Sequence, residues 1–240
     1  MIALYICRRS EGVKLSSKRL NAIVNMVPKS QTVADIGCDH GKIAVELIES
    51  GIAENVICTD ISENSLDKAK KLAAAKGLCD SVTFRHGDGM HVIRAGEADT
   101  AVIAGMGGEL IASILQSGET RVPDTLVLSC NTASRLLREW LCDNVFVIVD
   151  EQLVLEGRHF YPVILATRGN CESLSDIELE FGPVLLRTKP KTLKAYVNRR
   201  IELTKNIRKK LRKASKSNKD ALIKEIDAQS KKYEEVRKCL

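Results

Sequence analysis

Long hydrophobic runs are missing from this sequence of 240 residues. No apolar stretch approaches the roughly 18 residues that a membrane-spanning helix needs. The opening segment MIALYIC is apolar, but the basic pair Arg8-Arg9 follows it. A secretory signal has the reverse order and ends at small residues. We therefore expect a soluble, cytoplasmic protein that does not bind a membrane.

Paired cysteine motifs and dinucleotide-binding motifs are also missing. The eight cysteines are scattered, with no C-x-x-C pair and no Cys/His cluster, which argues against structural zinc and against a disulfide framework. We expect no metal site, and we expect most cysteines to pack as small hydrophobic groups. The absence of G-x-G-x-x-G argues against a nicotinamide-dependent oxidoreductase.

Positive charge is concentrated at the C-terminal end. The whole chain has a net charge of +6, but Thr188–Leu240 holds 18 basic and 6 acidic residues, a net charge of +12. The remainder, Met1–Arg187, has 19 basic and 25 acidic residues, a net charge of −6. A basic tail on an acidic body favours a polyanionic partner such as nucleic acid, although a solvated lysine-rich helix surface has the same composition.

Strand-like and helix-like segments alternate along the first part of the chain. Expected strands lie at 32–36, 55–59, 82–86, 99–104 and 125–129, and expected helices lie at 41–50, 63–76, 107–117 and 134–142. This alternation is typical of a parallel sheet with helices on both faces. Two further β-rich runs, 145–154 and 159–167, flank a turn at Glu156-Gly157-Arg158 and predict an antiparallel hairpin at the sheet edge. The sequence thus predicts a seven-stranded, mostly parallel α/β sheet.

Helical patterns flank this region on both sides. Residues 15–27 begin with the N-cap residues Ser16-Ser17 and carry apolar residues at helical spacing up to Pro28. After Pro190, two apolar stripes predict an antiparallel helical hairpin. In the polar segment 215–220 between them, Ser217 followed three residues later by Asp220 resembles a capping box. The stripes comprise Leu193, Val197, Ile207, Leu211 and Ala214, then Leu222, Ile226, Tyr233, Val236 and Leu240. A linker-like stretch at 168–176 separates the expected domains, 1–170 and 171–240.

The turn Asp35-Ile-Gly-Cys-Asp-His-Gly41 follows the first expected strand. Gly37 and Gly41 allow the backbone to approach a ligand closely. Its carboxylates suit a ligand with a positive group, such as the sulfonium and amino groups of S-adenosylmethionine, although a turn with incidental acids has the same pattern. His40 could contact the ligand or the target base, or could be structural.

Three more turns lie at the ends of the next strands, the edge where open α/β sheets bind ligands. Asp60 ends the second strand and could accept hydrogen bonds from ribose hydroxyls. Gly87-Asp88-Gly89 follows the third strand, and the Asp88 carboxylate could receive an adenine amino group. Ala104-Gly-Met-Gly-Gly108 opens a helix after the fourth strand, and Asn131 follows the fifth. Asn131 could hydrogen-bond a base, or could simply be a helix N-cap.

These motifs resemble one family, the bacterial tRNA (adenine-N1)-methyltransferases that modify adenine 22 in the D-loop region. The resemblance runs nearly from end to end. It rests on LSSKRL (15–20), VADIGCDHGK (33–42), GDGM (87–90), AGMGGELI (104–111), LVLSCN (126–131) with Arg138, and FGPVLL (181–186). It implies a class I methyltransferase domain (Rossmann-like) with a C-terminal coiled-coil hairpin, S-adenosylmethionine as the methyl donor, and tRNA as the substrate.

The resemblance and the turns together predict the site residues. The cofactor-binding set is Arg19, Asp35, Gly37, Asp39, His40, Asp60, Ile61, Gly87, Asp88, Gly89, Ala104, Gly105, Met106 and Gly107, and the expected catalytic residues are Asp39 and Asn131. Adenine N1 has an in-plane lone pair and needs no general base. The methylated base is cationic, so the Asp39 carboxylate could stabilise the developing charge. Cofactor binding explains Asp39 equally well.

Two departures from the family pattern touch the substrate side. The family's L-Q-P-N is Leu128-Ser-Cys-Asn131 here, and its Tyr-Glu is Tyr161-Pro162. Two other functions stay open at this point: a methyltransferase that acts on another substrate, and a non-catalytic RNA- or partner-binding protein with a residual cofactor pocket. The sequence leaves the oligomeric state open, and we favour a monomer.

Overall fold

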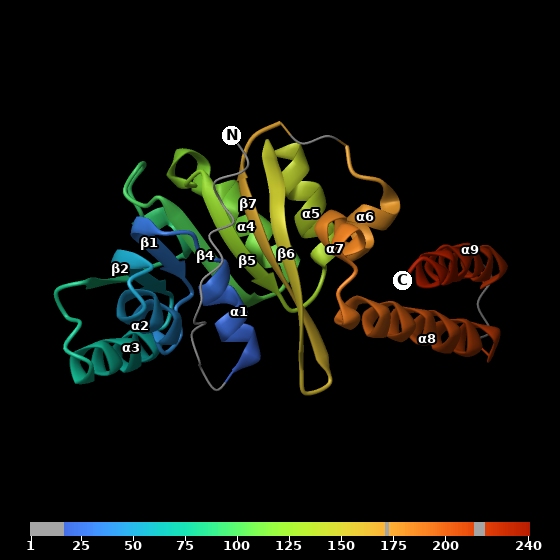
Figure 1. Cartoon of the computed structure of the whole chain (residues 1–240), viewed down its shortest axis with the longest axis horizontal. Coiled ribbons are helices and arrows are strands. Elements are labelled where there is room, and N and C mark those ends of the chain that lie inside the picture. The colour runs from blue at the N-terminus through green and yellow to red at the C-terminus, as the bar shows by residue number, and fades with distance from the viewer. Residues whose placement is uncertain (1–16, 171–172, 214–218) are drawn as a thin grey trace. The chain divides into compact units, whose positions relative to one another are not determined.

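The computed structural model describes residues 17–170, 173–213 and 219–240 (Figure 1). The chain divides into two compact units, Met1–Leu174 and Ser175–Leu240. In the described ranges, no helix has both the length and the apolar character needed to cross a membrane.

A seven-stranded sheet forms the centre of the first unit, in the order β3-β2-β1-β4-β5-β7-β6. Its strands are β1 (Ser30–Ile36), β2 (Ala53–Asp60), β3 (Val82–His86), β4 (Thr100–Met106), β5 (Thr125–Cys130), β6 (Phe146–Glu156) and β7 (His159–Arg168). Neighbouring strands are parallel except β7, which runs antiparallel to both β5 and β6. The predicted mostly parallel sheet and its closing hairpin are confirmed. Strand β5 is buried along its whole length, as expected for a strand covered on both faces.

Helices cover both faces of this sheet (Figure 1). They are α1 (Lys18–Met26), α2 (Lys42–Glu49), α3 (Glu63–Ala75), α4 (Gly108–Gly118) and α5 (Ser134–Asp143). The chain moves outward from β1 to β2 and β3, then in the opposite direction from β4 to β5. Right-handed crossovers therefore place α2 and α3 on one face and α4 and α5 on the other. Helix α1 packs beside α2, and Ser17 caps it by accepting a hydrogen bond from the Leu20 N–H at 3.2 Å.

The strand order reverses between β1 and β4. At this point the connections after the two strands leave on opposite faces and open a crevice at the carboxyl ends of the strands. The turns singled out in the sequence all follow strands that end at this edge. A short 3₁₀ turn that the sequence did not predict, η1 (Gly89–Val92), continues from the third of them. A second, η2 (Glu119–Arg121), follows α4.

Helix α5 is fixed to the outer sheet by an aromatic and an ionic contact. Trp140 stacks on Phe146 of β6 with a centroid separation of 6.1 Å. The Arg138 Nε lies 2.8 Å from the Glu151 Oε1, and the two side chains are only 1% and 0% exposed. Arg138, which is part of the family resemblance, therefore joins α5 to β6 inside the core.

The cysteines are less buried than expected. Cys38, Cys58 and Cys130 are buried, Cys142 is half-buried, and Cys79 and Cys239 are exposed. The prediction that most cysteines pack as small hydrophobic groups therefore holds for only half of the six in the described ranges.

The second unit contains α6 (Asp176–Phe181), α7 (Pro183–Thr188), α8 (Lys191–Lys213) and α9 (Lys219–Lys238). Helices α8 and α9 run antiparallel. Ion pairs between them join Lys205 to Glu234 at 3.2 Å and Arg208 to Asp227 at 2.6 Å, so residue numbers rise on α8 as they fall on α9. The predicted helical hairpin is confirmed, whereas its coiled-coil character stays a prediction. Ala214 and the expected capping residue Ser217 lie outside the described residues.

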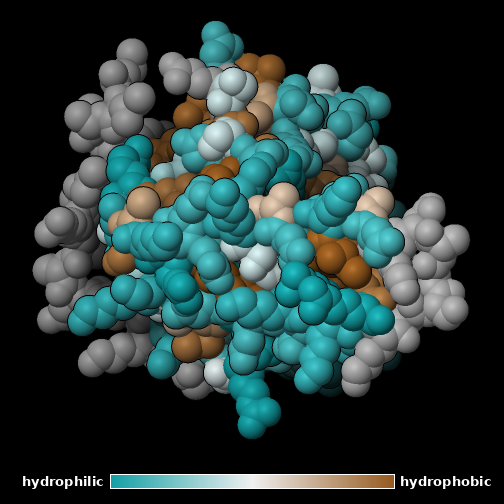
Figure 2. Space-filling model, turned by 90° about the vertical axis from the view of Figure 1, so that its right-hand side faces the viewer, coloured by the Kyte–Doolittle hydropathy of each residue, from teal (hydrophilic) through white to brown (hydrophobic). Residues whose placement is uncertain are grey.

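Apolar packing is uneven along this hairpin. Leu193, Val197 and Tyr233 are buried, and the Phe181 ring of α6 meets Tyr233 edge-on at 5.0 Å. Ile207 and Leu222, expected in the same stripes, are 48% and 42% exposed. Of the stripe residues that the structure describes, only Leu193, Val197 and Tyr233 are buried. The surface over α8 and α9 is mostly hydrophilic with smaller hydrophobic patches (Figure 2).

The stretch expected as a linker, 168–176, is partly structured. Strand β7 extends through Arg168, and Ser175 forms a reciprocal capping box with Glu178 at the start of α6. Helices α6 and α7 were not predicted, because six residues make fewer than two turns and give no readable apolar period.

Candidate functional site

A cavity of about 570 Å³ opens at the carboxyl ends of the central strands, and we call it the strand-end cavity. Its walls are Ser17, Arg19, Leu20, Ile36, Gly37, Cys38, Asp39, His40, Lys42, Ile43, Thr59, Asp60, Ile61, Gly87, Asp88, Gly89, Ala104, Gly105, Met106, Leu110 and Ile114. The turns after β1, β2, β3 and β4 therefore converge on one space. Of the residues predicted to bind the cofactor, only Asp35 and Gly107 do not line it.

The turn after β1 requires unusual backbone angles. Gly37 and Gly41 have φ of 74° and 68°, and Asp39 adopts φ of 48°. A Cβ at Gly37 would collide with the Met106 Cε, and one at Gly41 would lie 2.8 Å from the Ala69 Cβ. Only glycine allows the backbone to pass so close to its neighbours while keeping a left-handed conformation.

The carboxylate of Asp60 binds the backbone of this turn. The Asp60 Oδ2 accepts a hydrogen bond from the Asp39 N–H at 3.1 Å, and its Oδ1 accepts one from the Ser62 N–H at 2.8 Å. Asp60 thus ties the first turn to the start of α3, while each oxygen keeps another lone pair for a ligand. The Asp39 Oδ2 lies 2.7 Å from the His40 Nδ1, and the two side chains stay 72% and 44% exposed.

Asp35 lies in the core behind these groups. It is 2% exposed, and its Oδ2 has no hydrogen-bond partner. Burial, followed by the negative charges of Asp60 and Asp39, raises the pKa of Asp35 to about 7. A cation bound in the strand-end cavity would reduce the electrostatic repulsion among these three carboxylates.

An ion pair that the sequence did not reveal holds the loop after β3. Arg85 donates from Nη2 to the Glu97 Oε1 at 2.6 Å and from Nη1 to Oε2 at 2.7 Å, and Nη1 also donates to the Val92 carbonyl at 2.9 Å. The Arg85 hydrogen bonds lower the pKa of Glu97 to about 2. This Arg85–Glu97 clasp closes the loop that carries Asp88 into the cavity.

The glycines at the end of β4 and the start of α4 contact different parts of the molecule. Gly105 lines the strand-end cavity with φ of 84°. Gly108 instead packs on the turn before α5, where a Cβ would collide with the Ala133 carbonyl, and its N–H donates to the Thr132 carbonyl at 2.9 Å. Gly107 also faces that turn, since a Cβ there would lie 3.1 Å from the Thr132 Oγ1. The structure therefore places Gly107 against the turn before α5, and Gly107 is not among the residues of the cavity walls.

Asn131 and Arg19 bridge the rim of the cavity. The Asn131 Nδ2 donates to the Gly105 carbonyl at 2.7 Å, and its Oδ1 accepts from the Arg19 Nη1 at 3.3 Å. The N-cap residue of α5 is Ala133, so the N-cap interpretation of Asn131 is wrong. Arg19 also packs over the Tyr161 ring, with its Cζ 5.0 Å from the centroid. No signal in the sequence linked Tyr161 to Arg19.

Glu156, at the end of β6, was also missed. Its Oε1 accepts from the Ser17 hydroxyl at 3.0 Å and from the Arg19 N–H at 3.4 Å. These hydrogen bonds outweigh burial and lower the pKa of Glu156. The carboxylate holds the N-terminus of α1 and thereby fixes Arg19 at the cavity rim.

Within the described ranges, no three His, Cys, Asp or Glu side chains gather as a metal-binding group.

Comparison with known proteins identifies the family. The profile of the TrmK family, tRNA (adenine(22)-N(1))-methyltransferase, matches residues 33–233. The Bacillus subtilis tRNA (adenine(22)-N(1))-methyltransferase is 34% identical over 169 residues, which cover 69% of this chain and 71% of that protein.

Solved structures agree over nearly the whole chain. The crystal structure of the B. subtilis M1A22 tRNA methyltransferase TrmK superposes with a TM-score of 0.85 at 29% identity and covers 93% of this chain and 99% of that one. A Streptococcus pneumoniae protein in complex with S-adenosyl-L-methionine gives a TM-score of 0.78 at 28% identity and covers 93% and 100% of the two chains. This chain belongs to the TrmK family of tRNA (adenine(22)-N(1))-methyltransferases.

Proposed function

We propose that this chain transfers the methyl group of S-adenosylmethionine to N1 of an adenine in tRNA, at position 22 as in the family's name. The observation that carries the proposal is the convergence of four strand-end turns on one cavity whose walls include the carboxylates of Asp39, Asp60 and Asp88. We further propose that the chain works in the cytoplasm, where its tRNA substrate is. A monomer is our proposed functional form, because the cavity walls close within one chain.

The residues present fit this cofactor. When bound, S-adenosylmethionine supplies an electrophilic methyl group on a cationic sulfur. Asp35, whose buried Oδ2 has no partner, and Asp39 would balance the positive charges of the ligand. Asp60 has lone pairs left for ribose hydroxyls, and Asp88 would accept from the adenine amino group. Gly37 and Gly105 would let the ligand lie close to the backbone. Arg19, His40, Ile61, Gly87, Gly89, Ala104 and Met106 complete the proposed binding set through their place on the cavity walls.

Methyl transfer to adenine N1 depends mainly on positioning and water exclusion. We propose that the Asn131 Oδ1 accepts a hydrogen bond from the amino group of the target adenine and so directs N1 into the cavity. The amide is suited to this, since its Nδ2 is already bound to the Gly105 carbonyl. The Asp39 carboxylate would lie near the base as it becomes positive, and the entering base would shield this exposed group from water.

The second unit would supply most of the binding energy for tRNA. Adenine N1 is normally paired or stacked in folded RNA, so extruding the base costs a few kcal/mol. Phosphate contacts by lysines and arginines offset such costs. On α8, Lys209 and Lys210 flank a shallow depression that also includes Leu203, Asn206 and Ile207. We propose that this basic surface contacts the tRNA backbone while the first unit performs the reaction.

Methyl transfer to two transcripts tests the proposal. Unmodified tRNA with adenine at position 22 and the same tRNA with guanine there would be incubated with labelled S-adenosylmethionine. We expect label in the first transcript alone, and we expect nucleoside mass spectrometry to identify it as N1-methyladenosine. Equal labelling of both transcripts would assign another target, and no labelling of either would leave a binding protein.

A further inference from the structure

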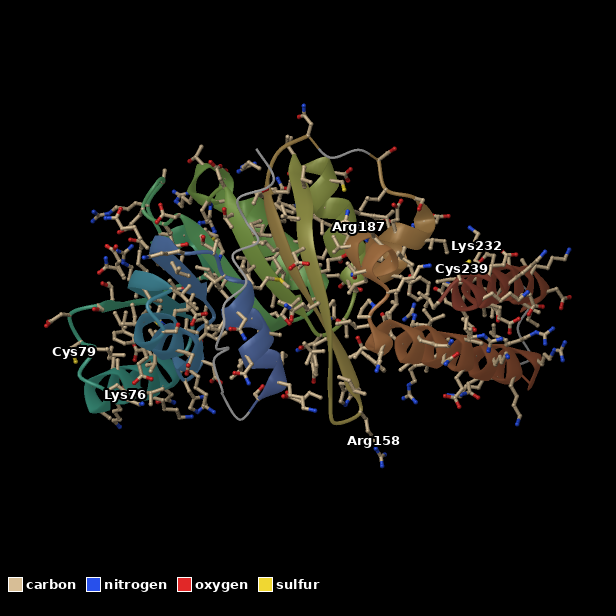
Figure 3. All side chains as sticks on the ribbon, in the orientation of Figure 1. Lys76, Cys79, Arg158, Arg187, Lys232 and Cys239 are labelled. Atoms are coloured by element: carbon tan, nitrogen blue, oxygen red, sulfur yellow. The ribbon has the colours of Figure 1, made fainter. Side chains whose placement is uncertain are left out.

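A row of cations and rings leads from the tip of the β6–β7 hairpin to the strand-end cavity. Arg158 lies at the hairpin tip, where its side chain points away from the sheet (Figure 3). His159 and Tyr161 follow on β7, with ring centroids 6.2 Å apart and an interplanar angle of 45°. Arg19 comes next, 5.0 Å from the Tyr161 ring, and it also lines the cavity. We call these four residues, three from the hairpin and Arg19 from α1, the hairpin face.

The alternation of side chains along the hairpin explains how this row arises. His159 and Tyr161 are two residues apart on a strand, so both point to the same face. Glu156 is the register partner of His159 and shares that face, where it holds the N-terminus of α1. Leu155 pairs with Phe160 and points to the opposite face. One face of the hairpin thus carries the His159 and Tyr161 rings and the Glu156 carboxylate, which holds the start of α1 and with it Arg19.

These rings are not core residues. His159 is exposed and Tyr161 is half-buried, although the chain has only 4 Tyr, 4 Phe and 1 Trp. Aromatic rings interleaved with cations at a cavity rim are the means by which proteins bind unstacked nucleotides: bases stack on the rings and phosphates pair with the cations. The Arg19 Nε adds a buried donor that has no partner.

We propose that the hairpin face binds the nucleotides beside the target adenine, with a neighbouring base stacked on Tyr161 and His159 and the backbone phosphates held by Arg158 and Arg19. The proposal rests on the proposed function, since extrusion of the adenine leaves its neighbours without a stacking partner. It assigns RNA binding to a part of the first unit that is separate from the basic helices.

A fluorescent base tests the contact directly. 2-Aminopurine would replace the nucleotide on the 5′ or the 3′ side of the target adenine in an otherwise unmodified tRNA, bound to the protein with S-adenosylhomocysteine. We expect emission from one of the two probes to be several-fold lower with the wild-type protein than with Tyr161→Leu. Leu155→Ala, which truncates a side chain on the opposite face of the same hairpin, should match the wild type. Equal emission with all three proteins for both probes would overturn the proposal.

Steady-state kinetics separate this inference from the proposed function. Loss of one stacking contact in Tyr161→Leu should raise the KM for tRNA about tenfold, while Tyr161→Phe should keep the wild-type KM. Calorimetry should give the same Kd for S-adenosylmethionine in all these variants. If the wild type methylates tRNA and Tyr161→Leu has an unchanged KM, the inference alone fails. A parallel loss of cofactor affinity would make Tyr161 a support of the cofactor cavity and would also overturn the inference. If the wild type transfers no methyl group to tRNA, the proposed function itself fails.

Discussion

Arg19 and Asn131 are separated by 112 residues in the sequence, yet the Arg19 Nη1 lies 3.3 Å from the Asn131 Oδ1. The contact joins α1 to the end of β5 across the rim of the strand-end cavity. The other end of the amide donates to the Gly105 carbonyl at 2.7 Å. Asn131 is therefore held in one orientation, with its oxygen turned toward Arg19 and its amino group toward β4.

The Asn131 contacts predict a defect in turnover that cofactor binding does not share. Asn131→Asp keeps the shape of the side chain but replaces the donor to the Gly105 carbonyl with an acceptor. We expect kcat for tRNA methylation to fall roughly 10- to 100-fold through misplacement of the adenine. The Kd for S-adenosylmethionine, measured by calorimetry, should change less than threefold. An equal loss of cofactor affinity would assign Asn131 to the cofactor side.

The buried Asp35 carboxyl should lower the stability of the cofactor-free protein at neutral pH while strengthening cofactor binding. Its pKa is raised to about 7 in the fold, so the folded state binds more protons than the unfolded state between about pH 4 and pH 7. Stability therefore falls as the pH rises through that window, by on the order of 4 kcal/mol if Asp35 acts alone. Asp35→Asn removes this contribution. Without cofactor, the variant should gain stability relative to the wild type more at pH 8 than at pH 5, and it should bind S-adenosylmethionine more weakly.

Thermal unfolding of both proteins at the two pH values checks this prediction, with calorimetry for the cofactor. An identical pH dependence of stability in the two proteins would show that Asp35 is not the titrating group. Unchanged cofactor affinity would remove Asp35 from the binding set.

Substitutions at two glycines with similar backbone angles distinguish the effect of backbone strain from that of a steric clash. Gly37 and Gly51 have φ of 74° and 63°, but a Cβ at Gly51 would meet nothing within 4 Å, whereas one at Gly37 collides with the Met106 Cε. Gly51→Ala should cost about 1–2 kcal/mol from strain alone and leave cofactor binding intact. Gly37→Ala should cost a similar amount, because the flexible end of Met106 can move aside, but the displaced Met106 should weaken S-adenosylmethionine binding at least tenfold. Equal effects of the two substitutions on affinity would contradict the close approach at Gly37.

The Arg85–Glu97 clasp predicts a loss of cofactor affinity from outside the cavity. Glu97→Gln weakens the hydrogen bonds that close the loop carrying Asp88, and we expect the Kd for S-adenosylmethionine to rise several-fold. Glu49→Gln is the matched control, because the Lys76–Glu49 pair is similar in length but 46% and 38% exposed and remote from the cavity walls. The same Kd in the two variants would show that the clasp does not position the loop.

Acid should release the same clasp. The pKa of Glu97 is lowered to about 2 in the fold, so the stability that it contributes is complete above about pH 4.5 and is lost as the pH falls toward 2. The difference in unfolding free energy between the wild type and Glu97→Gln should therefore shrink as the pH falls through that window. Acid titrations of both proteins at a fixed urea concentration measure this, and a constant difference would contradict the ion pair.

Basic residues on α8 predict a defect in tRNA binding alone. Arg208 is engaged by Asp227, and its neutralisation would disturb the hairpin itself, so it is unsuited to a test of phosphate contact. Gln at Lys209, Lys210 and Arg212 together should weaken tRNA binding and reduce the slope of log K against log salt by roughly 0.7–0.9 per lost contact. Filter binding over a salt series measures the slope, and calorimetry should give an unchanged Kd for the cofactor. Equal losses of both ligands would contradict the division of labour between the two units.

The sequence predicted the parts of this fold that repeat with a local period. Alternating strands and helices gave the seven-stranded sheet, and the polar turns after four strands did converge on one cavity. Contacts between distant segments gave no local signal: Glu156 at the α1 N-terminus, Tyr161 under Arg19, and Arg85 with Glu97. Gly107 was placed in the cofactor set because it belongs to a glycine-rich turn, and only the packing against Thr132 shows which way that turn faces.

Whether the strand-end cavity holds the methyl donor is measured by calorimetric titration of S-adenosylmethionine into the wild type and into variants with Asn at Asp39, Asp60 or Asp88, with Glu49→Gln as the control. We expect one site per wild-type chain, at least tenfold weaker binding in each of the three Asn variants, and wild-type affinity in the control. Wild-type affinity in all of the variants, or no binding to the wild type, would contradict the assignment of the strand-end cavity to the methyl donor.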